Sequence, residues 1–227
     1  AVGRNALNLN TAAGVTAVGT RALESNTTGV YNTAVGTYAL IANSSSNNNT
    51  AVGYDALNDN TDGSENTAIG SFALDKNTTA DNVTAVGYNS LGGNTTGANN
   101  TAVGSSALAN NTTASNNVAV GRESLMSNTV GFTANTAIGD ATLRANTTGS
   151  GNVAVGYTAL REGATRTNNT AVGFEALRLG SSGNNNTAIG RDSLTNNSAH
   201  NNTGVGHYTL RANTSGTDNV AVGANCL

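Results

Sequence analysis

The chain has 227 residues, of which 10% are charged and 37% are hydrophobic, with no proline, no tryptophan and one cysteine. The net charge of −3 comes from scattered single charges, which excludes a basic patch for nucleic acid and a polybasic membrane anchor. The 38 Asn and 34 Thr residues suit turns and strands and disfavour helix interiors, so we expect an all-β protein.

Cysteine content and hydropathy restrict the protein class further. The single Cys226 excludes a disulfide framework within this chain and a cysteine-based zinc site. No segment reaches the ~20 consecutive apolar residues of a membrane span, so we predict no membrane insertion. The chain opens on Ala1-Val2-Gly3, partway through the motif described next, and we interpret it as a fragment of a longer protein.

A repeated Ala-Val/Ile-Gly motif, with Gly204 in place of Ala in one copy, runs through the chain. Ten of the thirteen intervals between motif glycines are 17 residues, and the others are 16, 18 and 16. The fourteen motif glycines are Gly3, Gly19, Gly36, Gly53, Gly70, Gly87, Gly104, Gly121, Gly139, Gly156, Gly173, Gly190, Gly206 and Gly223. Such regularity predicts one repeat array over residues 1–227, folded as a parallel β-solenoid or β-roll of fourteen coils.

Within each repeat we expect four elements in chain order. A short strand, such as residues 50–53, is followed by a second extended segment at residues 56–57, then by an asparagine corner at residue 60 and a threonine-rich return turn. The residue before each motif glycine is Val or Ile, and the fourth residue after it is Leu in all copies, from Leu7 to Leu227. The repeating positions predict a structural ladder, represented by Val52, Gly53, Leu57, Asn60, Val103, Gly104, Leu108 and Asn111.

The seventh position after the motif glycine is Asn in eleven of thirteen copies. The two exceptions are Gly163 and Gly180. Because Asn and Gly share a tolerance for left-handed backbone, we predict a positive φ at this corner. Changes in repeat length fall between this corner and the next strand, which indicates a solvent-exposed return turn.

The segments Asn117-Val118-Ala119-Val120-Gly121 and Asn66-Thr67-Ala68-Ile69-Gly70 resemble the head repeat of YadA-type trimeric autotransporter adhesins. The longer unit that starts Asn49-Thr50-Ala51-Val52-Gly53 is more similar to arrays in phage tail-fibre and fibre-like bacterial surface proteins. The resemblance covers essentially the whole chain. It implies a left-handed parallel β-roll in each of three identical chains, in an extracellular protein of a virion or a bacterial surface.

A thin coil of Val, Leu and Ala buries little apolar area of its own, so association would stabilise it. Three parallel chains around one axis would cover the face lined by Ala and Gly, and a bulky charged residue at Ala119 should then prevent assembly. Whether the Val row or the Leu row faces that axis is left open by the sequence. The expected partner is therefore a second and third copy of this chain.

Candidate chemistry is sparse. His200 and His207 lie in adjacent repeats, and with Asp192 or Asp218 they offer a weak metal hypothesis; solvated side chains are the stronger interpretation. Calcium-binding nonapeptide and phosphate-loop patterns are absent. We therefore predict no cofactor, no metal and no enzymatic activity.

Two binding hypotheses remain beside the structural one. Repeated Asn-x-Ser/Thr sequences predict glycan acceptors along an exposed corner, although the composition alone produces such sequences readily. These acceptors are Asn26, Asn77, Asn94, Asn111, Asn146 and Asn213. Threonine pairs such as Thr78-Thr79 suggest an ice-binding row, which Asp62, Val130 and Ala164 interrupt.

Three tyrosines that directly follow a motif glycine, Tyr54, Tyr88 and Tyr157, could stack on sugars, whereas aromatic residues on strands usually serve packing. Our main expectation is a fibre shaft or adhesin segment that acts as a rigid spacer and presents an attachment tip. The alternative is a solenoid surface that binds a cell-surface glycan, another receptor or ice directly.

Overall fold

The computed structural model describes residues 1–131, 133–180 and 182–226, so Leu227 of the predicted leucine row lies outside the described residues. The chain forms two compact units, Ala1–Asn116 (unit 1) and Asn117–Leu227 (unit 2). Each unit is a parallel β-solenoid with one short strand per coil, and the described residues contain no helix. This confirms the predicted fold class.

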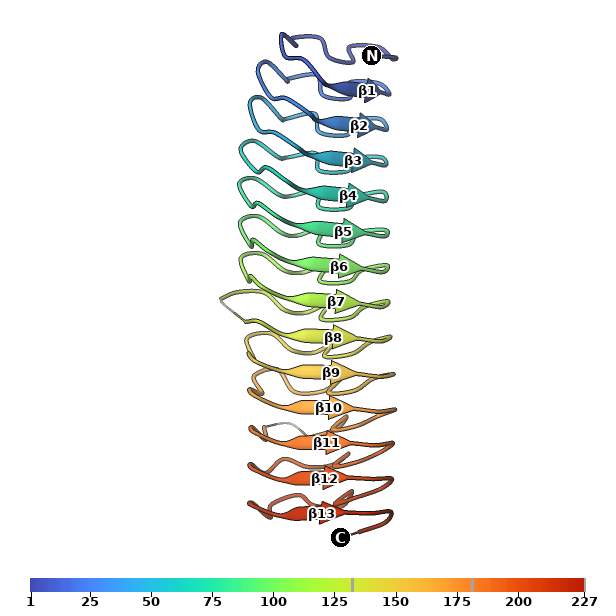
Figure 1. The fold of residues 1–227 in the computed structure, drawn as a ribbon, viewed down its shortest axis with the longest axis vertical. Coiled ribbons are helices and arrows are strands. Elements are labelled where there is room, and N and C mark those ends of the chain that lie inside the picture. The colour runs from blue at the N-terminus through green and yellow to red at the C-terminus, as the bar shows by residue number, and fades with distance from the viewer. Residues whose placement is uncertain (132, 181, 227) are drawn as a thin grey trace. The chain divides into compact units, whose positions relative to one another are not determined.

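Unit 1 has six strands among its residues, each three residues long (Figure 1). They are β1 (Thr16–Val18), β2 (Thr33–Val35), β3 (Thr50–Val52), β4 (Thr67–Ile69), β5 (Thr84–Val86) and β6 (Thr101–Val103). Each strand pairs in parallel with the next, and equivalent residues face each other, as Ala17 faces Ala34. In the first motif Val2 makes only an isolated bridge to Val18.

Unit 2 repeats the arrangement with seven strands in its described residues (Figure 1). They are β7 (Val118–Val120), β8 (Thr136–Ile138), β9 (Val153–Val155), β10 (Thr170–Val172), β11 (Thr187–Ile189), β12 (Thr203–Val205) and β13 (Val220–Val222). These strands also pair in parallel and in chain order. The 18-residue interval before Gly139 leaves the register intact, because Ala119 still faces Ala137.

The middle residue of each strand faces the interior, and its two neighbours face outward. Ala51 and Ala119 are fully buried, as are the interior leucines such as Leu57. The Val or Ile at the third strand position is half-exposed or exposed, for example Val35. The Leu row therefore fills the roll and the Val row lies on the surface. The expectation that the Ala-lined face meets other chains is wrong. Side chains alternate along a strand, and the middle Ala of each three-residue strand points into the interior of its own coil.

The segment after each strand is a tight turn, so the predicted second strand at residues 56–57 is wrong. Gly53 has a φ of 142°, and Asp55 and Leu57 have φ values of 52° and 53°. A Cβ on Gly53 would overlap the backbone carbonyl of Gly70 in the next coil, so only glycine fits there. A left-handed Leu is uncommon, and full burial of its side chain stabilises this conformation.

The predicted left-handed corner at the seventh position is also wrong. Asn60 and Asn94 do not have positive φ, and of the two glycines that replace Asn only Gly163 does. The left-handed residues are instead the second and fourth after the motif glycine and, in most coils, the fifth before the next one, such as Glu65. A different requirement must therefore account for the conserved spacing of Asn.

Candidate interaction surface

The asparagines at the seventh position form a buried ladder of amide hydrogen bonds. Nδ2 of Asn60 donates to Oδ1 of Asn43 at 3.2 Å and to the carbonyl of Gly63 in its own turn at 2.8 Å. Nδ2 of Asn77 in turn donates to Oδ1 of Asn60 at 2.8 Å. Asn60 is fully buried, so its amide replaces water as the partner of interior backbone groups. Side-chain amide chemistry, and not backbone conformation, is the reason for Asn here.

A second asparagine ladder lies four residues before most motif glycines, with Val15 and Val83 as exceptions, and it was not predicted from the sequence. Oδ1 of Asn49 accepts from the backbone N–H of Asn66 at 3.0 Å, and Nδ2 of Asn49 donates to the carbonyl of Gly63 at 2.9 Å. Oδ1 of Asn66 accepts in the same way from the N–H of Val83 at 2.9 Å. The recurrence of Asn just before the Thr-Ala-Val segment was the available signal.

The ladder residues named from the sequence divide between the interior and the surface. Four are fully buried: Leu57, Leu108, Asn60 and Asn111. The other four form the outer end of a strand and the turn after it: Val52, Gly53, Val103 and Gly104. The interior four maintain the coil, and the valines are available for contacts with other molecules.

The proposed glycan acceptors lie in the buried ladder and not on an exposed corner. The side chains of Asn26, Asn77, Asn94, Asn111 and Asn146 are fully buried, and Asn213 is half-buried. The Nδ2 atom that a glycan would modify is already a hydrogen-bond donor, as in Asn94, where it binds Asn77 and the carbonyl of Gly97. The folded coil leaves no exposed amide at these five buried positions.

Arg166 compensates for the first glycine in the asparagine ladder. Its side chain is 1% exposed, and Nη1 donates to the carbonyl of Leu177 at 3.0 Å. A Cβ on Gly163 would overlap Nε of Arg166, so the guanidinium occupies the space of the missing Asn side chain. Burial lowers the pKa of Arg166 to about 10. Oδ1 of Asn146 and the Nε and Nη2 atoms of Arg166 have no hydrogen-bond partner in the described part of the chain.

The outer face of the strands carries two parallel rows. In unit 1 the first strand position forms an unbroken threonine row, which comprises Thr16, Thr33, Thr50, Thr67, Thr84 and Thr101. The third position forms a row of Val and Ile, which comprises Val18, Val35, Val52, Ile69, Val86 and Val103. Ile69 is 41% exposed, and within the described residues the hydroxyls of these strand threonines make no hydrogen bond to the protein. In unit 2 the first position is Thr in four described strands and Val in three, which are Val118, Val153 and Val220.

The return-turn threonines have a structural role. Oγ1 of Thr78 donates to the carbonyl of Thr95 at 3.1 Å, and Oγ1 of Thr147 donates to the carbonyl of Ala164 at 3.0 Å. These hydroxyls hold adjacent coils together. The hydroxyl of the first threonine in each of these two pairs is therefore used in a bond between coils.

An aromatic row borders the turns of unit 1. It consists of Tyr38, Tyr54, Phe72 and Tyr88, one ring in each of four consecutive coils. The guanidinium of Arg21 lies over the ring of Tyr38 at 5.6 Å. Two of the three tyrosines noted in the sequence belong to this row. The structure adds Tyr38 and Phe72, each of which is the second residue after its motif glycine.

Among the described residues no three His, Cys, Asp or Glu side chains gather where they could hold a metal ion. Nδ1 of His200 accepts from the N–H of Asn184, and the ring of His207 packs on Tyr208, so the two histidines have separate partners. No described helix has the length and apolar character needed to cross a membrane.

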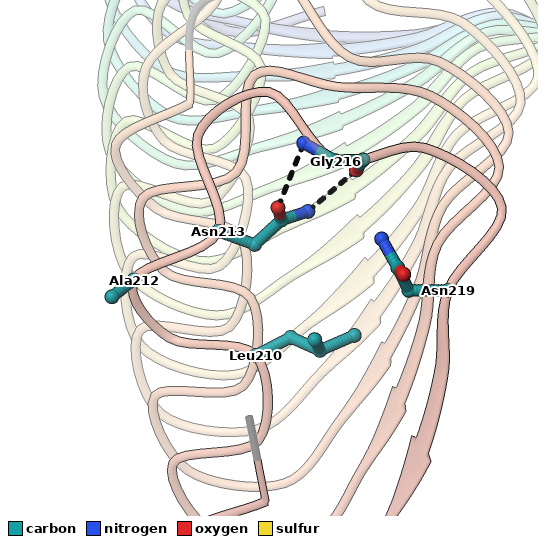
Figure 2. Close-up of a pocket in the computed structure, with 5 residues that line it drawn as sticks. All are labelled: Leu210, Ala212, Asn213, Gly216 and Asn219. Atoms are coloured by element: carbon teal, nitrogen blue, oxygen red, sulfur yellow. Dashed lines mark hydrogen bonds between the residues drawn. The ribbon is translucent and has the colours of Figure 1, made fainter.

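A pocket of about 370 Å³ lies at the ladder residues of the coil that contains Leu210. Figure 2 shows its lining, which includes Leu210 and Asn219. There Nδ2 of Asn213 donates to the carbonyl of Gly216, and the backbone N–H of Gly216 donates to Oδ1 of Asn213 (Figure 2). The bond from the Asn amide to a carbonyl three residues later recurs in other coils, as in Asn60. The lining contains no carboxylate, imidazole or thiol, so we assign it no chemistry.

Comparison with known proteins finds no protein-family model, no curated protein and no solved structure that matches this chain.

Proposed function

We propose that the chain is a structural segment of an extracellular fibre, on a virion or a bacterial surface, that acts as a rigid spacer presenting an attachment tip. In this proposal three copies associate through the outer Val/Ile row. The observation that carries the proposal is this row itself. Val or Ile occupies the third position of every described strand, although these side chains lie on the surface and do not fill the interior.

The energetics favour association through this face. Covering one half-exposed Val or Ile side chain contributes about 1 kcal/mol, so a row of six in one unit offsets a substantial part of the association cost. Parallel packing of identical chains keeps every coil beside an equivalent coil, which makes the contact additive along the row. The number three follows from the resemblance to trimeric fibres.

The test is the oligomeric mass of the full chain, measured by light scattering after size-exclusion chromatography. We expect three chains per particle, and monomers for Val35→Asp and Ile69→Asp with an unchanged circular dichroism spectrum. Thr79→Asp, on the exposed return turn, is the matched control and should remain trimeric. A monomeric wild type would refute the proposal.

A second candidate function, ice binding, is favoured by the unbroken threonine row of unit 1. The hydroxyls of these threonines have no hydrogen-bond partner among the described residues. Repeated at the ~4.8 Å strand spacing beside a row of methyl groups, they form a regular amphipathic surface. Inhibition of ice recrystallisation by a monomeric chain, lost in Thr50→Lys and retained in Thr79→Lys, would support this function. An inactive trimer would exclude it.

A further inference from the structure

The four rings of the aromatic row alternate between two positions. Tyr54 and Tyr88 directly follow their motif glycines, whereas Tyr38 and Phe72 come one residue later. Successive ring centroids lie 6.0, 5.4 and 6.1 Å apart, and successive planes meet at 71°, 77° and 89°. Edge-to-face contacts of this kind are favourable and fix the rings against one another.

The alternation leaves two rings prominent on the surface. Tyr54 is 46% exposed and Tyr88 is 58% exposed, whereas Tyr38 and Phe72 are half-buried. Tyr54 and Tyr88 are two coils apart, a separation of about 10 Å at the strand spacing. This is comparable with the length of a disaccharide unit in an extended β-1,4-linked chain, in which every second ring presents the same face.

Carboxylates border the row. Asp55 raises the pKa of the Tyr54 phenol through its charge and a hydrogen bond, and Asp75 acts in the same direction. Nζ of Lys76, the nearby cation, lies 3.1 Å from Asp59 and 3.2 Å from Asp75. Because unit 1 has seven acidic and three basic residues, its field disfavours an anionic ligand.

We propose that the aromatic row binds a neutral, extended β-1,4-linked polysaccharide. The C–H faces of alternate pyranose rings stack on Tyr54 and Tyr88, and sugar hydroxyls donate hydrogen bonds to the bordering carboxylates. The row follows the strand and lies beyond the Val/Ile row, so this binding does not depend on self-association.

Unit 2 supplies an internal control. There Tyr157 and Phe174 stack face to face, with centroids 5.2 Å apart and planes at 19°. The guanidinium of Arg191 lies over the ring of Phe174 at 5.4 Å. Tyr157 is exposed like Tyr54, but one of its faces is occupied, and among the described residues of unit 2 no ring two coils away continues the row.

The experiment measures binding of cellohexaose and chitohexaose to the full chain by isothermal titration calorimetry, with maltohexaose and polygalacturonate as comparison ligands. We expect binding of a β-1,4-linked hexaose that is insensitive to salt. Tyr54→Ala and Tyr88→Ala should each weaken it about 3- to 10-fold, and the double variant should abolish it, whereas Tyr157→Ala should not change it.

Two further variants separate stacking from folding. Tyr54→Phe keeps the flat ring and should retain binding of the hexaose. Tyr54→Leu keeps an apolar contact with Phe72, so its unfolding midpoint should not change, but it should lose binding of the hexaose. The proposal is overturned by a wild type that binds neither β-1,4-linked hexaose, by equal affinity for maltohexaose or polygalacturonate, or by equal losses in Tyr54→Ala and Tyr157→Ala.

Discussion

Replacing Asn94 by Ala tests the amide ladder directly. Nδ2 of Asn94 donates to Oδ1 of Asn77 at 3.0 Å and to the carbonyl of Gly97 at 3.1 Å, and its Oδ1 accepts from Nδ2 of Asn111 at 2.6 Å. The carbonyl of Gly97 keeps a second donor, Asn100, so the substitution leaves two buried groups short of a partner. At about 1–3 kcal/mol for each such group, the free energy of unfolding should fall by about 2–6 kcal/mol.

The assay is urea unfolding of the full chain, followed by circular dichroism, with Asn110→Ala as control. Asn110 is adjacent to a ladder residue in the next coil but is exposed, so its loss should change stability by less than about 0.5 kcal/mol. Asn94→Gly and Asn94→Val should be about as damaging as Asn94→Ala, because all three remove the amide. Tolerance of Gly together with a selective loss in Val would refute the ladder and restore the left-handed corner.

Three further predictions concern other positions of the coil. Because burial lowers the folded-state pKa of Arg166 from its ordinary value to about 10, the unfolded chain binds more protons above about pH 10. The stability of the wild type relative to Arg166→Met should therefore rise as the pH increases through about 10. A difference in urea unfolding midpoint between the two proteins that does not change with pH would contradict this. Gly53→Ala should cost at least about 1–3 kcal/mol by thermal unfolding, with a smaller loss in Gly131→Ala, where no atom lies within 4 Å of the added Cβ. Ala119→Glu should unfold the coil, whereas Val118→Glu should stay folded by circular dichroism; the opposite order would reverse the assigned faces.

The repeat was sufficient to predict equivalent environments, but it did not predict their orientation. Fourteen in-register copies indicate stacking, because only a stacked coil gives Leu57 and Leu108 the same surroundings. An alternating Ala-Val pair, however, fits a strand with either residue inward. The left-handed turn at Leu57 accompanies full burial of this leucine and of Ala51, and local propensity argues against such a turn.

The role of asparagine was missed because two physical properties of the residue give the same sequence signal. Asn tolerates positive φ, and it also carries a donor and an acceptor that can bridge coils, so Gly163 and Gly180 suggested the first property. Only the structure shows that Arg166, three residues after Gly163, occupies the vacated space. The aromatic row was half predicted, since Tyr54 and Tyr88 were noted, whereas contact with Phe72 depends on the geometry of adjacent turns.

The ladder hydrogen bonds have a consequence for how such a gene can change. Most of these bonds connect residues 17 apart, and the bonds from Asn26 to Asn10 and from Asn146 to Asn128 span 16 and 18 residues. A coil can therefore form the same hydrogen bonds with any adjacent coil that carries Asn at the ladder position. Duplication or loss of one whole coil by recombination should therefore alter length without disturbing local structure. The coil that contains Gly163 and Arg166 is the exception, because the guanidinium occupies the space beside this glycine and the two residues must therefore be inherited together.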